Sequence, residues 1–262
     1  MPYYLIFNSN YNEFLYNDGA LGNDFLGNIT SLQFLYYGST SFSFPGIPSA
    51  IGKLTNLIEY DCSFSLYNGP IPDIFGPLKK LNYLDLSDND WLGNGIPSSL
   101  IALPNLEFFY FENVFTDATL NFLVGMPKIL EFWADFTSWG STIPSGIGLV
   151  KTLQSLSLTF CELQGTIPTE FATLPLLKQV WLYQNSLTGA IPPALANAPS
   201  LQVLQVEGNN VMGAMPSEIC VKQSSTGLFT TLGSDCERGG KVTCGCCSCC
   251  GATNCGNFLG KK

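Results

Sequence analysis

The dipeptide Ile-Pro, once replaced by Met-Pro, recurs along this chain at a nearly constant interval, and this period constrains the fold more than any other feature. Successive prolines are 24, 25, 47, 24, 24 and 24 residues apart, so one interval spans two periods; they are Pro48, Pro72, Pro97, Pro144, Pro168, Pro192 and Pro216. The pattern L-x-x-L-x-L precedes them, as at Leu81, Leu84 and Leu86. Eight such copies in phase, after a partial one at Leu5, indicate a solenoid of stacked coils.

Each repeat predicts one short strand and an irregular return leg. Alternate residues of x-L-x-L-x point to opposite faces of a strand, so the leucines enter the core and the x residues face outward. A polar residue three positions after the last leucine, such as Asn89, Asn185 or Asn209, is expected to bond the turning backbone of adjacent coils. Prolines shortly before the next strand exclude a long helix. We therefore predict a curved, right-handed α/β solenoid with a parallel sheet on the concave side and 3-10 turns and loops on the convex side.

The return legs resemble a known family. Leu187-Thr188-Gly189-Ala190-Ile191-Pro192 and Leu163-Gln164-Gly165-Thr166-Ile167-Pro168 are similar to the L-x-G-x-I-P signature of plant-specific leucine-rich repeats. This resemblance covers roughly residues 1–219 and implies the fold of receptor-like proteins, receptor kinases and polygalacturonase-inhibiting proteins, which recognise peptides, steroids, glycans or proteins. The chain departs from plant receptors in having no N-terminal cysteine pair and no kinase, and its C-terminal cysteines more nearly resemble those of diatom and algal repeat proteins.

The cysteines near the C-terminus predict a second region that follows the solenoid. We assign residues 1–219 to the solenoid, about nine coils of which the first is incomplete, and residues 220–262 to a cysteine-rich cap and tail. In an oxidising compartment an even set of cysteines predicts disulfides, here among Cys220, Cys236, Cys244, Cys246, Cys247, Cys249, Cys250 and Cys255. Overlapping C-x-x-C pairs leave a metal site as the alternative. Seven glycines from Gly227 to Gly256 argue against regular helix in this segment.

The two remaining cysteines test the register. Cys62 falls on an inward strand position and Cys161 on the position that asparagine takes in other repeats. They lie four coils apart, roughly 19 Å at ~4.8 Å per coil, which is too far for a disulfide. We therefore predict that both are buried free thiols.

The outward strand residues are mainly acidic and aromatic, and none of them is Lys or Arg. The candidate ligand-binding residues on the predicted concave face are Tyr36, Glu59, Asp61, Tyr83, Asp85, Phe108, Tyr110, Glu112, Glu131, Trp133, Asp135, Gln179, Trp181, Tyr183, Gln205 and Glu207. Aromatic side chains gathered on a surface are typical of interaction sites, and the carboxylates attract cationic groups. The alternative is that these residues only keep the protein in solution and pack on one another.

Three functions are consistent with this face. We predict a scaffold without enzymatic activity that binds a protein or peptide, basic or aromatic, while the alternatives are a carbohydrate-binding module and a structural assembly protein. An enzyme is disfavoured because the chain has no histidine and an open strand face offers no water-excluding pocket for a carboxylate pair such as Asp61 and Asp85. No catalytic residue, cofactor or metal is predicted.

The charge and the hydropathy of the chain limit its possible binding partners and its cellular location. With 20 acidic against 11 basic residues and a net charge of −9, the chain repels nucleic acid. Its apolar runs are shorter than the ~20 residues that span a bilayer, so this chain is not expected to cross a membrane. The first residues lack the features of a signal peptide, yet the cysteine pattern favours a secreted, lumenal or cell-surface protein. The sequon Asn28-Ile29-Thr30 is a weak signal for glycosylation, and an ordinary convex-loop sequence is an equally good interpretation of it.

Overall fold

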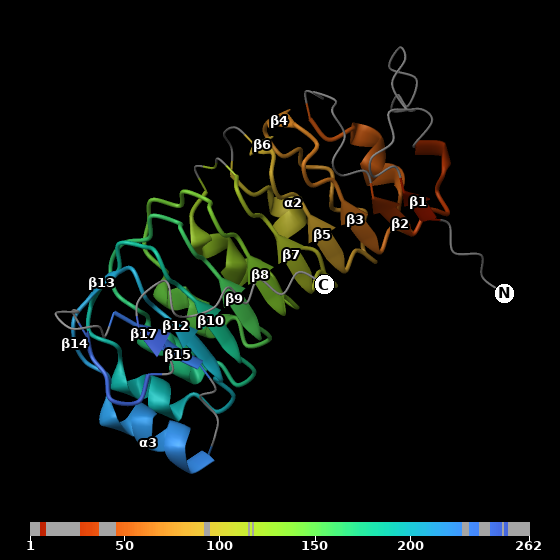
Figure 1. Ribbon diagram of the computed structural model, residues 1–262. Coiled ribbons are helices and arrows are strands. Elements are labelled where there is room, and N and C mark those ends of the chain that lie inside the picture. The colour runs from red at the N-terminus through yellow and green to blue at the C-terminus, as the bar shows by residue number, and fades with distance from the viewer. Residues whose placement is uncertain are drawn as a thin grey trace. The chain divides into compact units, whose positions relative to one another are not determined.

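The computed structural model of the protein describes residues 6–8, 27–36, 46–91, 95–114, 116, 118–226, 231–235, 242–247 and 249–250. The chain forms two compact units, Met1–Trp139 and Gly140–Lys262. Both units are leucine-rich-repeat solenoids, in which a row of short parallel strands alternates with return legs of 3-10 helix and turn (Figure 1). This architecture confirms the fold predicted from the repeat.

The strands of the first unit pair in chain order. They are β1 (Ile6–Asn8), β2 (Phe34–Tyr36), β3 (Glu59–Asp61), β5 (Tyr83–Asp85), β7 (Phe108–Tyr110) and β8 (Glu131–Trp133). From β2 onward the central residue of each strand is buried and faces the central residue of the next, in the series Leu35, Tyr60, Leu84, Phe109 and Phe132. The residues on either side are partly exposed, as the alternation of strand side chains requires.

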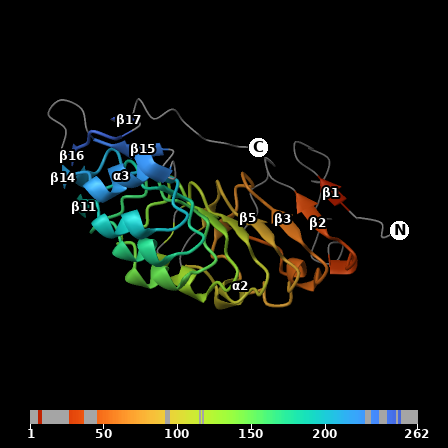
Figure 2. The same ribbon diagram turned by 90° about the horizontal axis from the view of Figure 1, so that it is seen from below.

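The return legs of the first unit are short. They contain the 3-10 helices η2 (Ser49–Lys53) and η3 (Leu120–Gly125), the four-residue helix α2 (Ser98–Ile101), and the paired strands β4 (Asn68–Gly69) and β6 (Asp90–Trp91). In Figure 2, α2 lies on the side of its coil away from β5. Pro104 and Pro127, each two residues before the first core residue of the next repeat, prevent longer helices there. The prediction of 3-10 turns and loops on this side is confirmed.

Aromatic side chains fill the core where the repeat departs from its consensus. The coil without Ile-Pro, at Leu120, lies next to strands whose inward residues are Phe109 and Phe132, with ring centroids 5.5 Å apart. Phe122 of η3 contacts both rings, at 6.3 Å and 5.5 Å, and the Trp139 ring at 6.0 Å. Large rings thus replace leucines and keep the interior packed.

The second unit repeats the pattern. Its main strands are β9 (Ser155–Ser157), β10 (Gln179–Trp181), β12 (Val203–Gln205), β15 (Thr231–Ser234) and β17 (Cys249–Cys250), paired in that order. Its return legs contain η4 (Ser145–Leu149), η5 (Thr169–Thr173) and η6 (Pro193–Asn197). Short strands pair beside them: β11 (Thr188–Gly189) with β13 (Asn210–Val211), and β14 (Gly213–Ala214) with β16 (Val242–Thr243).

Buried asparagines join successive coils, as predicted. The side-chain oxygen of Asn185 accepts hydrogen bonds from the backbone N–H of Cys161 and Leu163, both at 3.0 Å. Its amide nitrogen donates to the carbonyls of Leu158 and Leu182, at 2.7 Å and 3.0 Å. Asn89 and Asn209 make equivalent bonds. One side chain therefore satisfies four backbone groups that the turn would otherwise leave without partners.

The cysteine-rich segment begins with a helix. Helix α3 (Ser217–Thr226) packs against η6, so the expectation that this segment would not be helical was wrong for Cys220–Thr226. The reason is that the first glycine, Gly227, comes only after the helix has ended. The predicted boundary between solenoid and cap at residues 219 and 220 falls inside α3, and that division stays a prediction.

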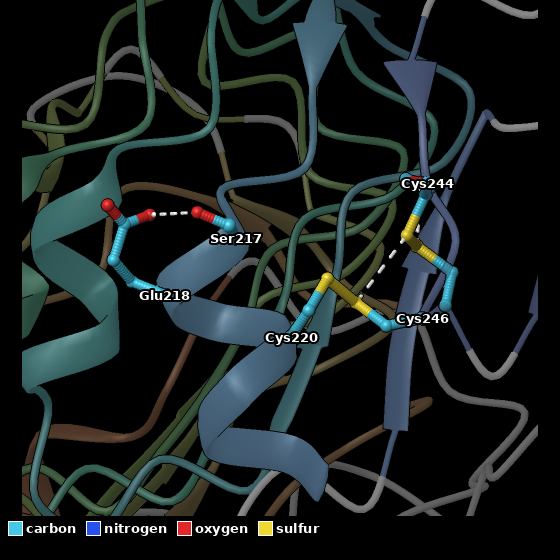
Figure 3. The surroundings of a disulfide bond; sticks show 7 residues. Ser217, Glu218, Cys220, Cys244 and Cys246 are labelled. Carbon is cyan, nitrogen blue, oxygen red and sulfur yellow. Dashed lines mark hydrogen bonds between the residues drawn. A yellow bond between two sulfur atoms is a disulfide. The ribbon is translucent and has the colours of Figure 1, made fainter.

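Disulfides form among the cysteines of this segment, as predicted, and one of them connects α3 to the residues between β16 and β17. Cys220 of α3 is bonded to Cys246, and Cys244 is bonded to Cys247 (Figure 3). The second bond uses both sulfurs of one C-x-x-C pair, which removes them from the possible metal ligands. Cys236 and Cys255 lie outside the described residues, as do the side chains of Cys249 and Cys250.

In the part of the chain that the structure describes, no helix has both the length and the apolar character needed to cross a membrane.

Candidate functional site

The predicted ligand-binding residues of the first unit lie together on the outward side of its sheet. We call this surface the acidic strand face and define it by the residues Tyr36, Glu59, Asp61, Tyr83, Asp85, Phe108, Tyr110, Glu112, Glu131 and Trp133, all partly exposed. Strand pairing sets their neighbours, because Glu59 faces Tyr83 and Asp61 lies between Tyr36 and Asp85. Each carboxylate of these strands therefore has an aromatic residue on at least one neighbouring strand, and Asp61 also faces Asp85.

Phenol groups hold two of the carboxylates in place. The Tyr36 hydroxyl donates a short hydrogen bond to Glu59, and the Tyr110 hydroxyl donates to Oε2 of Glu131 at 3.3 Å. Burial, followed by the neighbouring carboxylates, raises the pKa of Tyr36 and of Tyr110 above the ordinary tyrosine value. Both phenols consequently stay neutral donors at physiological pH.

The aromatic rings of this face contact one another. The ring centroids of Tyr83 and Tyr110 are 5.3 Å apart, and those of Tyr110 and Trp133 are also 5.3 Å apart in an edge-to-face arrangement. Such pairs restrict ring motion and lie within the separations that aromatic pairs favour. The rings form a connected row across β5, β7 and β8 rather than three independent side chains.

Two aspartates form the most acidic point of the face. Asp61 and Asp85 occupy paired positions of β3 and β5. Oδ1 of Asp61 accepts from the backbone and hydroxyl of Ser63, at 2.9 Å and 2.8 Å, and Oδ1 of Asp85 accepts from the Ser87 backbone at 2.9 Å. Burial first, and the charge of Asp61 second, raise the pKa of Asp85 to about 6. Like charges placed opposite each other are unfavourable, so a cation between them is favoured.

The described lysines belong to the return legs and to α3, and none of them lies on a strand. Two of them bond amide side chains of the preceding coil, Lys80 to Asn56 and Lys128 to Asn105, each at 2.7 Å. The acidic strand face therefore has no basic side chain from its own strands to neutralise it.

Three predicted site residues are buried instead of outward on the surface. Asp135 is 4 % exposed, Gln205 6 % and Glu207 1 %. In the second unit Gln179, Trp181 and Tyr183 remain partly exposed, and the Tyr183 ring contacts Phe160 edge-to-face at 5.8 Å. The predicted residues of this unit thus present aromatic and amide groups and no exposed carboxylate.

Strand β15 covers Glu207. A side-chain carbon at Gly233 would come within 2.0 Å of Oε1 of Glu207, so any larger residue there would displace this carboxyl group. Gln205 donates to the same oxygen at 3.4 Å, and Asp235 follows on β15's C-terminal side. Burial and the charge of Asp235 raise the pKa of Glu207 to about 7. This residue interacts with the cap and does not face solvent.

Exposed apolar residues next to the acidic strand face were not anticipated from the sequence. Phe64 and Leu66 follow β3, are 48 % and 52 % exposed, and have left-handed backbone conformations with φ of 52° and 54°. This conformation costs ordinary residues roughly 1–2 kcal/mol. In later repeats the turn position of Phe64 is occupied by Asp88 and Asn113, which adopt the left-handed conformation more readily. An aromatic residue at this position was therefore the signal in the sequence.

The two predicted free thiols are confirmed. Cys62 and Cys161 are both buried and neither belongs to a disulfide, and burial raises the pKa of the Cys62 thiol well above its ordinary value. Among the residues that the structure describes, no cluster of three or more acidic or cysteine side chains is arranged to hold a metal ion.

The repeat register, the parallel strands and the asparagine bonds between coils define a leucine-rich-repeat protein. Residues 152–174 match the family described as Leucine Rich Repeat. This match covers one full period, from the end of one return leg to the next. A comparison with curated proteins finds no match.

Solved structures share the fold. The Arabidopsis receptor kinase HAESA, in complex with the peptide hormone IDA and the co-receptor SERK1, is 30% identical over 79% of this chain and 34% of that chain, with a TM-score of 0.68. PEPR1 in complex with AtPEP1 is 28% identical over 74% of this chain and 27% of its own, with a TM-score of 0.63. A leucine-rich-repeat protein of Leptospira interrogans, 24% identical with a TM-score of 0.65, supports the fold alone. The chain spans about a third or less of the two receptors.

Proposed function

We propose that this chain is a non-enzymatic recognition scaffold that binds a polypeptide with cationic side chains through the acidic strand face. The single observation that carries the proposal is the joint placement of carboxylates and contacting aromatic rings on one outward surface without any basic residue. HAESA, whose solved complex contains the peptide hormone IDA, supports a polypeptide as the class of ligand.

A cationic peptide suits this surface for two physical reasons. A guanidinium or ammonium group near Asp61 and Asp85 relieves the repulsion between two paired carboxylates, and charge-assisted hydrogen bonds are the stronger kind. Rings such as Tyr83 and Trp133 add cation–π contacts and apolar area. We therefore expect arginine, which has a planar guanidinium that stacks on rings, to bind more tightly than lysine.

The alternatives from the sequence have less support. A carbohydrate ligand finds no support in the comparisons, and a purely structural role leaves the uncompensated aspartate pair without explanation. An extracellular or lumenal location forms part of the proposal. The disulfides Cys220–Cys246 and Cys244–Cys247 support it, because such bonds persist in oxidising compartments.

The test uses two synthetic peptides of equal length, one rich in Arg and Trp and one in which Glu replaces every Arg. Isothermal titration of the whole chain should detect binding of the Arg peptide and none of the Glu peptide. Affinity should fall steeply between 50 and 500 mM salt, whereas sugar stacking would change little. It should also fall as the pH drops below about 6, because protonation of Asp85 removes its charge.

Variants locate the binding surface. Asp61→Asn and Trp133→Ala should each weaken binding of the Arg peptide about tenfold, as expected for the loss of a charge-assisted bond or an aromatic anchor. Asp90→Asn is the matched control, because Asp90 is an exposed carboxylate of the same unit on β6, away from the acidic strand face. Equal affinity of all three variants would place binding elsewhere and refute the assignment.

A further inference from the structure

We propose that Asn28 is an acceptor site for an N-linked oligosaccharide, attached to the side of the first unit opposite the acidic strand face. Asn28-Ile29-Thr30 is the sole Asn-x-Ser/Thr sequence, with x other than proline, in the whole chain. Such a sequence is required for glycosylation but is not sufficient, since the asparagine must also be accessible. The fold supplies three observations that favour modification.

The first observation is exposure that the repeat itself dictates. Asn28 is exposed and stands four residues before the first leucine of its repeat, Leu32. The equivalent position of every later coil is also exposed; these residues are Lys53, Pro77, Ala102, Gly125, Leu149, Thr173 and Asn197. Because coils stack in register, this position points to solvent at each level of the solenoid. The exposure of Asn28 is therefore a property of the architecture and not of one loop.

The second observation concerns the threonine and the backbone of the sequon. Thr30 is exposed, at a repeat position occupied by other exposed residues such as Thr55 and Lys151. Its carbonyl accepts a hydrogen bond from the Asn56 side chain at 2.9 Å, and the Leu32 N–H donates to the carbonyl of Ile29 at 2.9 Å. Both bonds use backbone oxygens and neither uses the Asn28 amide or the Thr30 hydroxyl, and both residues are exposed.

The third observation is the chemistry of the compartment. Disulfides in the second unit indicate passage through an oxidising compartment, and in eukaryotes the glycosylation of such sequons occurs there. The donor is a lipid-pyrophosphate-linked oligosaccharide. The Asn28 amide nitrogen bonds to the anomeric carbon of the sugar, the bond from that carbon to the phosphate oxygen breaks, the amide loses one proton, and the lipid pyrophosphate leaves.

The placement has a consequence for binding. Asn28 belongs to the return leg that leads into β2, whereas Phe34 and Tyr36 of the same coil face outward from the sheet. A glycan at Asn28 covers the return-leg side and leaves the acidic strand face open. Its removal should not change the affinity for the Arg peptide. This expectation rests on the proposed function, whereas the mapping of the glycan to Asn28 does not.

The experiment expresses the full chain behind a cleavable secretory leader in yeast and maps the secreted protein by mass spectrometry. Peptide-N-glycosidase in ¹⁸O-labelled water should convert Asn28 to labelled Asp. Thr30→Ala should abolish the modification, whereas Thr30→Ser, which keeps the hydroxyl, should retain it. Thermal melting of both variants checks that the fold is unchanged.

A gain-of-site variant provides the matched control. Asn197 occupies the same repeat position as Asn28 but is followed by Ala198 and Pro199. Pro199→Thr completes a sequon at that position, and we expect a second glycan on Asn197. A secreted, folded protein that carries a glycan at Asn197 in this variant and none at Asn28 would overturn the proposal, as would the absence of both glycans.

Discussion

The carboxyl group of Glu207 offers a quantitative test of how the cap covers the last coils. The perturbation is Glu207→Gln, which keeps the shape of the side chain and removes its charge. Burial beneath β15 raises the pKa of Glu207 from 4.5 to about 7. The folded protein therefore favours the neutral carboxyl group of Glu207 over the ionised one.

The sign and size of the effect follow from proton linkage. Between pH 4.5 and 7 the folded protein holds a proton on Glu207 that the unfolded chain releases, so this group lowers the free energy of unfolding as the pH rises. Each pKa unit corresponds to about 1.4 kcal/mol, and the raised value gives an upper limit of about 3 kcal/mol. We expect Glu207→Gln to match the wild type at pH 5 and to exceed its stability by up to about 3 kcal/mol at pH 8.

Urea denaturation at pH 5, 6, 7 and 8, with the disulfides intact, measures this difference. Glu218→Gln serves as the control, because Glu218 is an exposed carboxylate of α3 and should change stability little at any pH. A difference between wild type and Glu207→Gln that does not grow with pH would refute the reasoning. It would mean that β15 does not cover this carboxyl group.

Three further predictions concern the core and the cap. Asn185→Ala leaves backbone groups of two coils without partners, and we expect a loss of about 3 kcal/mol or more in urea denaturation; a loss below about 1 kcal/mol would contradict the role of the asparagines. Cys62 and Cys161 should resist iodoacetamide in the folded protein and react after unfolding, as peptide mapping can show; rapid labelling of either in the native state would contradict their burial. Replacing both Cys220 and Cys246 by Ser removes a crosslink between residues 26 apart, which should cost about 3 kcal/mol on the loop-entropy account; an unchanged urea midpoint would show that this bond does not hold the cap.

The periodic part of the chain was predictable because one register determines every coil. The positions of Glu59 and Asp61 on either side of a buried strand residue followed from alternation alone. The burial of Cys62 and Cys161 followed from the same register. These predictions needed only a residue's place within the repeat, and neighbouring coils supply the same surroundings each time.

The features that could not be predicted depend on contacts outside the repeat. Glu207 occupies an outward position, yet β15, which carries no repeat signal, covers it. Helix α3 lies in a stretch whose glycines obscured the helical residues before Gly227. The left-handed conformation of Phe64 is a different case, because it recurs at Asp88, Asn113 and Phe136 and so belongs to the turn of the repeat. What hid it is the residue type, since an aromatic residue does not favour this conformation.

The pairing of each strand with its sequence neighbours makes the coil an exchangeable unit. Deleting or duplicating a segment between equivalent prolines, such as Pro168 and Pro192, changes the number of strands in the main sheet by one. Every remaining core side chain still points into the core. A deletion of one residue within a strand has the opposite result, because it exchanges the two sides of that strand. Whole-period changes in length are therefore tolerated by this architecture, and single-residue changes are not.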